Sequence, residues 1–409
     1  MSNFNNKILK FKKNDQTCKN CNICSTIIQC PGDGTCIGCG ACYWACPSKA
    51  FYKSSEISNI LVNIKVDNII IRVSKEITVK EALSQAGFLF TKDPTKDGIF
   101  APCETGGCYA CAVIVNGKIK PVCHSGFKEG TVIKTSLTED ITPLRIVHGY
   151  QPHSVGGVGT PWKLKQGGRY IEVACFTAGC NFRCETCQNF TTTYNSKIPP
   201  ITPVQAAAQL TLARKRYKVD RMAISGGEPT LNRKWLIQFF HHLKILNNDQ
   251  KARLHLDTNG SLLTRDYIDD LIQAGITDIG PDLKSHDQEI FSKITGIEDN
   301  ELVKTYMNNA WLAVKYITDK YYPNDVFMGV GLPYNSYFYP NLDKVHEWGI
   351  KLCKIDSGLQ VTVLDYRPIF RNNLIKRPSV DEMIKVKSIL EATGLKNVII
   401  QTVNGHFGP

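Results

Sequence analysis

The sequence has no apolar run long enough to span a bilayer, and its first residues, MSNFNNKILKFKK, lack the apolar core of a secretion signal. These two absences argue against a membrane-embedded or exported protein, so we expect a soluble protein of the cytoplasm. A stripe of mixed basic and aromatic residues is also missing, which argues against a nucleic-acid partner. The lysines between residues 7 and 19 predict a basic, solvated amino-terminal arm, with docking to an acidic partner as the alternative.

Cysteine, in contrast, is abundant, with 17 among the 409 residues. Without a secretion signal, closely spaced cysteines indicate metal binding rather than disulfides. Fifteen of the seventeen fall into three groups. The two left over, Cys175 and Cys353, are interpreted as small buried apolar residues.

The first cysteine group, in residues 1–56, is an internal duplication. A CxxCxxC run followed by Cys30-Pro31 is repeated by a second such run followed by Cys46-Pro47. This is the pattern of bacterial ferredoxins with two [4Fe–4S] cubes, in which the last cysteine of each half binds the other cube. A pair of structural zinc sites is the alternative. The predicted ligands of one cube are Cys18, Cys21, Cys24 and Cys46, and those of the other are Cys30, Cys36, Cys39 and Cys42.

The second group lies in residues 57–137, which read as strands with one helix. ILVNIKV and NIIIRV predict a hairpin, Thr78 starts a helix over 78–87, and Asn116-Gly117 predicts a hairpin turn. The cysteines have gaps of four, two and eleven residues, and the first three match the plant-type [2Fe–2S] loop. The segment resembles the β-grasp ferredoxin domains of succinate dehydrogenase and hydrogenase subunits; a zinc or rubredoxin-like site is the alternative. The predicted ligands are Cys103, Cys108, Cys111 and Cys123.

Residues 138–169 are predicted to form a linker. Its glycine-rich run at 148–162 is interpreted as a linker packed on the domain that follows, with a glycine-rich lid as the alternative. Residues 170–409 alternate strands and helices, which predicts a parallel α/β sheet, either open or closed into a barrel. The predicted helices cover 202–217, 231–246, 264–275, 300–320, 341–353 and 379–394. The predicted strands cover 219–225, 252–257, 276–284, 325–333, 359–368 and 397–403.

The third cysteine group is the run CNFRCETC, which contains Cys180, Cys184 and Cys187. A [4Fe–4S] cube needs four ligands and this loop offers three, so one iron stays open to a chelating ligand. The loop follows the apolar segment IEVACF, which places it at the end of a predicted strand.

Four further polar or glycine-rich runs also stand at predicted strand ends, where parallel α/β folds bind ligands. They are SGGEP at 225–229, DTNG at 257–260, DLK at 282–284 and GVG at 329–331. Gly226 and Gly227 would let the backbone approach an amino-acid moiety, and Glu228 would anchor its ammonium group. Taken singly, each run is as typical of a plain turn or a surface ion pair.

Together these motifs resemble the radical S-adenosylmethionine (SAM) proteins, specifically the pyruvate formate-lyase activating-enzyme branch and the radical SAM member of the AmmeMemoRadiSam system. The resemblance covers about 170–331 and implies a partial (β/α)6 barrel. It implies SAM contacts at Gly226, Gly227, Glu228, Asp257, Thr258, Asn259, Asp282 and Lys284, and a monovalent cation held by Asp257, Thr258 and Asp282. Thr186 departs from the family, which usually has an aromatic residue there beside the adenine.

The resemblance implies an oxidoreductase that cleaves SAM reductively to a 5′-deoxyadenosyl radical, which then abstracts hydrogen from a substrate. The catalytic residues would be Cys180, Cys184, Cys187 and Lys284, with electron transfer from a ferredoxin- or flavodoxin-like donor through the chain's own ferredoxin domains. A protein glycine is one candidate substrate. After Cys187 only Cys353 remains, so no carboxyl-terminal auxiliary cluster is expected, and no cobalamin-binding segment is present.

Two other classes stay open. An electron-transfer subunit without SAM chemistry would also join these two types of ferredoxin domain. An RNA-modifying radical enzyme would suit the formal charge of +12. However, fifteen thiolates on three cubes and one [2Fe–2S] centre would lower that charge by roughly 7, which weakens the RNA interpretation.

Overall fold

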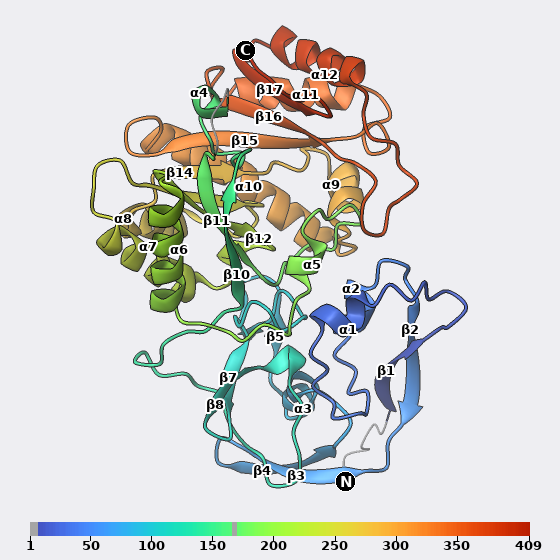
Figure 1. Ribbon diagram of the computed structural model, residues 1–409. Helices are drawn as coiled ribbons and strands as arrows, with labels where there is room; N and C mark the ends of the chain where they lie inside the picture. The colour runs from blue at the N-terminus through green and yellow to red at the C-terminus, as the bar shows by residue number, and fades with distance from the viewer. Residues whose placement is uncertain (1–6, 166–169) are drawn as a thin grey trace. The chain divides into compact units, whose positions relative to one another are not determined.

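The computed structural model describes residues 7–165 and 170–409 (Figure 1). The chain divides into two compact units. The first unit comprises the chain up to Val147 together with Thr177–Asn181 and Asn189–Thr202. The second comprises His148–Phe176, Phe182–Gln188 and Pro203–Pro409.

The first unit opens with a strand in place of the predicted solvated arm. Strand β1 (Lys7–Lys13) pairs antiparallel with β2 (Phe51–Ile57), and helices α1 (Ile23–Ile27) and α2 (Ala41–Ala45) lie between them in sequence. Lys10 is buried, donates to the carbonyl oxygen of Cys36 at 2.6 Å and forms an ion pair with Glu76 at 3.2 Å. The arm prediction was wrong because the spacing of Ile8 and Phe11 buries one face of this lysine-rich strand.

The rest of the first unit contains a five-stranded mixed sheet within the described residues, in the order β4–β3–β9–β7–β8. The predicted hairpins are confirmed: β3 (Leu61–Val66) pairs antiparallel with β4 (Ile69–Ser74), and β7 (Ala112–Val115) with β8 (Lys118–Pro121). Strand β9 (Val132–Lys134) runs parallel to β3. The predicted helix is α3 (Val79–Gln85), whose cap Thr78 accepts a hydrogen bond from the amide of Glu81 at 3.1 Å.

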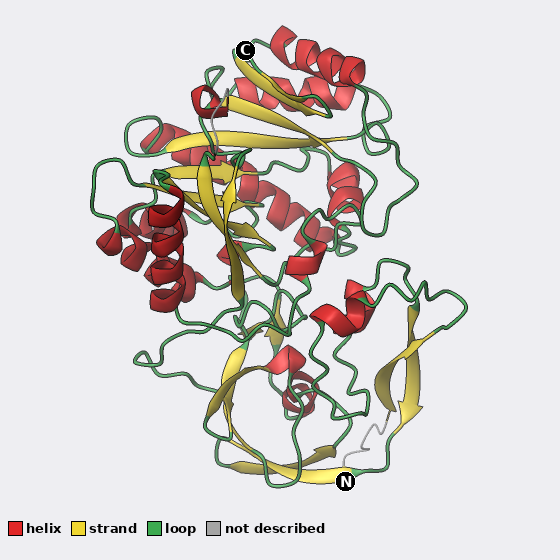
Figure 2. Cartoon of the chain, viewed as in Figure 1, coloured by secondary structure: helices red, strands yellow, loops and turns green. Residues whose placement is uncertain are grey.

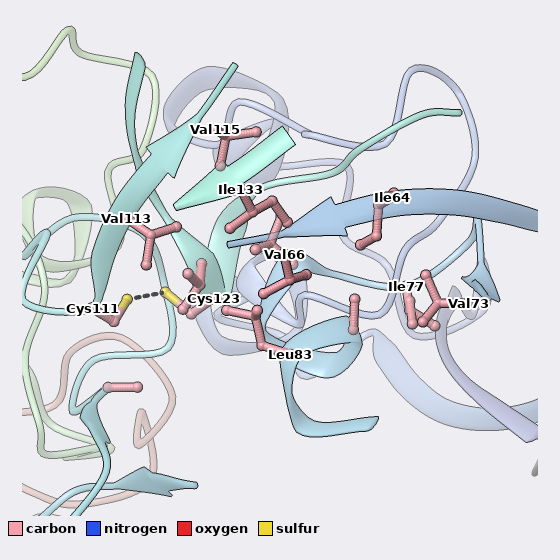
Figure 3. Packing of buried hydrophobic residues seen from close by; sticks show 14 of the residues in the cluster. Ile64, Val66, Val73, Ile77, Leu83, Cys111, Val113, Val115, Cys123 and Ile133 are labelled. Carbon is pink, nitrogen blue, oxygen red and sulfur yellow. Dashed lines mark hydrogen bonds between the residues drawn. The ribbon is translucent and has the colours of Figure 1, made fainter. Parts of the chain in front are cut away.

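Figure 3 shows the apolar core of this sheet, where side chains of β3, β7 and β9 meet Leu83 of α3. Two of the predicted cluster cysteines, Cys111 and Cys123, belong to the same core. The smaller elements of the unit are β5 (Phe90–Thr91), β6 (Ile99–Phe100), η1 (Val122–His124) and α5 (Phe190–Thr193).

The second unit is built on a sheet with nine strands in the described residues, which follow one another in chain order from β10 to β18. Six consecutive strands, β12 to β17, are parallel to their neighbours, and β18 turns back antiparallel to β17. Figure 2 shows helices alternating with these strands. The predicted α/β class with parallel strands is therefore confirmed, and the open order is consistent with a partial barrel.

The bounds of these elements follow. The strands are β10 (Val147–His153), β11 (Glu172–Thr177), β12 (Arg221–Gly226), β13 (Arg253–Thr258), β14 (Asp278–Pro281), β15 (Phe327–Tyr334), β16 (Gln360–Asp365), β17 (Asn397–Thr402) and β18 (Gly405–Phe407). The helices are α4 (Trp162–Lys165), α6 (Pro203–Tyr217), η2 (Pro229–Leu231), α7 (Arg233–Leu246), α8 (Arg265–Ala274), α9 (Gln288–Thr295), α10 (Asn300–Lys320), α11 (Asp343–Cys353) and α12 (Val380–Ala392).

The segment predicted as a linker contributes a strand to this sheet. Strand β10 lies at its edge, next to β11. Residues 166–169 of the same segment lie outside the described residues. Among the helices that are described, none combines the length and the apolarity needed to cross a membrane.

A buried ion pair stabilises the start of the parallel strands. Asp278 is fully buried and contacts Arg221 at 2.8 Å and Arg253 at 2.9 Å. We expect Asp278→Asn to lower the free energy of unfolding by about 3 kcal/mol or more, because a buried guanidinium loses its closest counter-charge. The exposed control Asp319→Asn, which breaks the helical pair with Lys315, should cost less than about 0.5 kcal/mol. Equal urea midpoints for the two variants would contradict this.

Candidate functional site

The predicted three-cysteine loop follows β11. Cys180 belongs to the first unit, and Cys184 and Cys187 to the second. In the second unit, the carbonyl oxygen of Glu185 accepts hydrogen bonds from the amides of Arg371 and Asn372, at 3.0 and 3.1 Å. The segment at Arg371 and Asn372 thus fixes the middle of the cysteine loop. No local pattern in the sequence predicts this contact.

The cysteine loop has two features that suit the binding of a cluster and its ligand. Burial raises the pKa of Cys184 to about 12, although nearby Lys284 acts in the opposite direction. Iron binds the thiolate, so loading of a cluster must displace this proton. Next to Cys187, the buried hydroxyl of Thr186 has no hydrogen-bond partner in the described part of the chain, which is unusual for a buried polar atom unless a bound molecule supplies the partner.

The SGGEP run follows β12, and its glutamate joins two strand ends. Glu228 is buried and accepts four hydrogen bonds, from the Thr230 amide at 2.9 Å and hydroxyl at 2.6 Å, the Thr258 hydroxyl at 2.7 Å and the Asn259 amide at 2.7 Å. The carboxylate therefore positions the loop after β13 relative to Gly226, whose φ is 110°. Binding of an ammonium group by Glu228 stays a prediction.

Asp257 points to a buried partner at the end of β13. One of its carboxylate oxygens lies 3.2 Å from Nε2 of His255, which is fully buried. Burial lowers the pKa of His255, but Asp257 and Glu172 raise it to about 9, so this imidazole is protonated at neutral pH. The roles predicted for Asp257 toward SAM and a monovalent cation stay predictions.

Two glycines make room for this aspartate. A Cβ atom at Gly157 would overlap the Asp257 carboxylate, and one at Gly280 would lie 2.7 Å from it. Gly159 likewise approaches the backbone of Ile279 in β14. The glycine-rich run of the predicted linker therefore packs on the sheet, as expected from the sequence.

The DLK run forms a buried ion pair, which excludes the surface pair considered above. Lys284 is 7% exposed; its Nζ lies 2.8 Å from Asp282 and 3.2 Å from the hydroxyl of Tyr366. Burial would lower the pKa of Lys284, but Asp282, Tyr366 and Cys184 raise it well above its ordinary value. A Cβ atom at Gly331 would overlap Asp282, which explains the glycine in the GVG run. Tyr366, which follows β16, was not among the residues predicted from the sequence.

Four buried thiols of the first unit gather as a [2Fe–2S] centre would require. The sulfur atoms of Cys111 and Cys123 are 3.6 Å apart (Figure 3), and the thiol of Cys103 shares hydrogen bonds with those of Cys108 and Cys123. A tetrahedral metal with bonds of about 2.3 Å to sulfur places two thiolates about 3.8 Å apart, so the pair fits a single iron.

The thiols of the second predicted cube also lie near one another. Burial raises the pKa of Cys39 to about 11 and that of Cys42 to about 12, and neighbouring thiols, including those of Cys30 and Cys36, add to both increases. For residues 7–165 and 170–409, no three histidine, cysteine or acidic side chains meet the geometry of a single-ion site. Iron–sulfur clusters place only one or two protein thiolates on each iron, so this geometry does not test them.

The ferredoxin segment also supplies hydrogen bonds to sulfur. The amide of Phe11 donates to Cys36 at 3.3 Å, that of Asn20 to Cys18 at 3.4 Å and that of Ala50 to Cys46 at 3.3 Å. Such bonds are one way in which a protein tunes the potential of an iron–sulfur cluster. The residues present therefore fit the predicted cofactors in donor type.

Comparison with known proteins assigns two parts of the chain. Residues 175–335 match the model of the radical SAM superfamily, and residues 33–52 match that of a 4Fe-4S binding domain. A probable GTP 3′,8-cyclase of Methanococcus aeolicus is 34% identical over 135 residues, which are 33% of this chain and 43% of the cyclase.

Two further comparisons differ in coverage. A putative glycyl-radical enzyme activating enzyme of Methanocaldococcus jannaschii is 27% identical over 53% of this chain and 76% of its own length. The structure of Streptococcus suis SuiB bound to S-adenosylmethionine superposes with a TM-score of 0.39 and 15% identity, over 52% of this chain and 44% of that one. This chain thus spans less than half the length of the cyclase and of SuiB.

Proposed function

We propose, from the premise that residues 175–335 form a radical SAM domain, that the protein is an enzyme that cleaves SAM reductively at a [4Fe–4S] cluster held by Cys180, Cys184 and Cys187. The observation that supports this most is the buried Lys284–Asp282 pair beside the cysteine loop. Burial raises the pKa of the Cys184 thiol, and the ammonium group of Lys284 acts against this increase. When bound, the cluster supplies one electron to SAM, which separates into methionine and a 5′-deoxyadenosyl radical that takes a hydrogen atom from the substrate.

The residues at the strand ends would divide the binding of SAM among them. Lys284 would pair with the carboxylate of SAM. Its buried ammonium group is positioned by Asp282 and has further N–H donors for a second carboxylate. The backbone of Gly226 and Gly227 would accept the amino group. Glu228 would keep the loop with Thr258 and Asn259 in place through its four hydrogen bonds. The cation proposed at Asp257, Thr258 and Asp282 would lie beside the methionyl end.

The first unit would carry electrons to this site. Its mixed sheet with helix α3 and four buried thiols supports a β-grasp [2Fe–2S] domain in residues 57–137. The segment before it supports two [4Fe–4S] cubes with eight cysteine ligands. Four of these eight cysteines lie in the matched region 33–52. The electrons would come from a ferredoxin- or flavodoxin-like protein in the cytoplasm.

Two substrate classes deserve a direct assay. The relatives named above include a GTP cyclase and a putative glycyl-radical enzyme activating enzyme, so GTP and a glycine of a partner protein are the first probes. The activating-enzyme class agrees better with the motifs at the strand ends. The cyclase class would be favoured instead if SAM were cleaved to 5′-deoxyadenosine only when GTP is present and a modified nucleotide were formed.

The test is an anaerobic reconstitution of the full chain with iron and sulfide. We expect about 14 irons per chain and, with dithionite and SAM, equal amounts of 5′-deoxyadenosine and methionine. Iron without any cleavage of SAM would overturn the proposal and support an electron-transfer protein instead. Zinc in place of iron at the three-cysteine loop would also overturn it.

A further inference from the structure

Two cysteine loops of the first unit pack against each other without any side chain between them. A Cβ atom at Gly107 would lie 2.6 Å from Cβ of Ala178 and 2.7 Å from the amide nitrogen of Gly179. A Cβ atom at Gly179 would lie 2.9 Å from the amide nitrogen of Cys108 and 3.1 Å from Cβ of Cys103. Gly179 directly precedes Cys180, so the loop of the [2Fe–2S] thiols contacts the residue next to the first predicted ligand of the SAM cluster.

Hydrogen bonds hold this contact in register. The amide of Ile146 donates to the carbonyl oxygen of Gly107 at 3.2 Å, and the amide of Ala178 donates to that of Ile146 at 3.0 Å. The amide of Gly179 donates to the carbonyl oxygen of Thr193 at 2.8 Å. Both loops are therefore fixed by the same short stretch of chain, and the approach is not a loose surface contact.

A second contact joins the other end of the [2Fe–2S] site to a predicted cube. His124, the residue after Cys123, is buried and its Nε2 donates to the carbonyl oxygen of Gln29 at 2.7 Å. Gln29 directly precedes Cys30, whose thiol lies with those of Cys39 and Cys42. One hydrogen bond thus connects the residue before a predicted ligand of the cube, Cys30, to the residue after a predicted ligand of the [2Fe–2S] centre, Cys123.

We propose that the [2Fe–2S] centre is the last carrier before the SAM cluster, and that the cube at Cys30 feeds it through His124. This inference rests on the proposed function. An external one-electron donor protein reduces the cube, and one electron passes by way of Cys123 to the centre and by way of Cys108 and Gly179 to the cluster at Cys180. Each carrier is oxidised by one electron as the next is reduced by one. The final electron breaks the bond between sulfur and the 5′ carbon of SAM.

The alternative order sends the electron from a cube straight to the SAM cluster. The ferredoxin segment does contact the chain that follows this cluster: the amide of Ser196 donates to the carbonyl oxygen of Ile27 at 2.9 Å, and the Gln29 amide donates to the Ser196 hydroxyl at 3.0 Å. Ser196 is nine residues beyond Cys187 in sequence, whereas Gly179 is bonded to Cys180. The route through the [2Fe–2S] loop is therefore the one that ends next to a predicted cluster ligand.

The first test reads magnetic coupling rather than activity. In fully reduced protein, we expect the SAM-cluster signal in electron paramagnetic resonance to relax more slowly in Cys103→Ser, which removes the neighbouring centre. The same signal should be unchanged in Cys39→Ser, which disrupts the cube. Relaxation that responds to Cys39→Ser and not to Cys103→Ser would overturn the proposed order. Absence of any [2Fe–2S] signal in wild-type protein would also overturn it.

The second test keeps all clusters and changes only the contact. Gly179→Ala and Gly117→Ala are matched, because their φ angles are +83° and +77° but only Gly179 has neighbours within 4 Å of the added atom. In rapid mixing with a reduced donor protein, we expect Gly179→Ala to slow reduction of the SAM cluster by roughly threefold or more, since a methyl group must force packed backbones apart. Gly117→Ala should reduce the cluster at the wild-type rate. Equal rates in both variants would contradict the proposal.

A third variant separates the two steps. His124→Phe keeps a flat aromatic ring at this position but removes the hydrogen bond to Gln29. It should slow reduction of the [2Fe–2S] centre by the donor, while transfer from that centre to the SAM cluster keeps its rate. If dithionite fails to cleave SAM in wild-type protein although the coupling pattern appears, the proposed function fails and the carrier order stands. If SAM is cleaved but the coupling pattern is absent, only the proposed order of the carriers is overturned.

Discussion

Replacing Cys184 by alanine should abolish the reductive cleavage of SAM and leave the first unit loaded. The bound iron should fall from about 14 to about 10 per chain, because only the cube with three protein ligands is lost. Formation of 5′-deoxyadenosine with dithionite should fall by about 1,000-fold or more, since no other group in the proposed site supplies the electron. Iron analysis and chromatography of the nucleoside measure the two effects.

Cys353→Ala is the matched control for this variant. Cys353 ends helix α11 and is one of the two cysteines outside the three groups. Its replacement removes the same thiol group elsewhere in the second unit and should leave both iron and cleavage near the wild-type level. If Cys184→Ala keeps its full iron content, a fourth protein group holds that cluster, and the open iron on which the proposed chemistry depends does not exist.

The elements that sequence predicted well are those in which local signals agree. Helices α3 and α12 begin where Thr78 and Ser379 cap them, and both caps accept the amide three residues later. Helix α7 and strand β13 have strong apolar patterns of their own period, and their predicted bounds differ from the observed ones by one or two residues. The alternation of strands and helices could therefore be predicted from the apolar patterns and the helix caps.

The misses share a different cause, which is contact between distant parts of the chain. The sequence of strand β1 is typical of a charged tail. Only the fold shows that Lys10 pairs with Glu76 and donates to the carbonyl oxygen of Cys36. Helix α9 was missed because a short run between two turns gives little periodic signal, although Asp287 caps it. Tyr366 lies 82 residues from Lys284, so nothing local in the sequence pairs the two.

The same reasoning applies to the candidate site. Spacing alone indicated the cysteines and the strand-end motifs, because ligand chemistry is local in sequence. The partners that orient these groups come from elsewhere, as Arg371 and Asn372 do for the backbone at Glu185. The close approach of Gly107 and Gly179 could not be predicted either, since each glycine is typical of its own loop and only the fold brings them together.

Removing the charge at Lys284 should weaken SAM binding more than any other single change outside the cysteines. We expect Lys284→Met to raise the KM for SAM about 10- to 150-fold, which corresponds to the loss of a charge-assisted hydrogen bond worth about 1.5–3 kcal/mol. Lys344→Met is the control: this exposed lysine pairs with Glu347 at 2.9 Å on the surface and should leave the KM unchanged. Tyr366→Phe should have a smaller effect of about 2- to 10-fold, because Lys284 keeps its bond to Asp282.

Two other roles for Lys284 would give different results. If the ammonium group acts only on the charge of the cluster, Lys284→Met should shift the reduction potential of the SAM cluster and leave the KM for SAM unchanged. If it acts only in the transition state, kcat should fall with the KM unchanged. Kinetics at saturating and limiting SAM, combined with a redox titration followed by electron paramagnetic resonance, separates these cases. The assignment of Lys284 to the SAM carboxylate requires that the KM respond and that Tyr366→Phe shift it in the same direction.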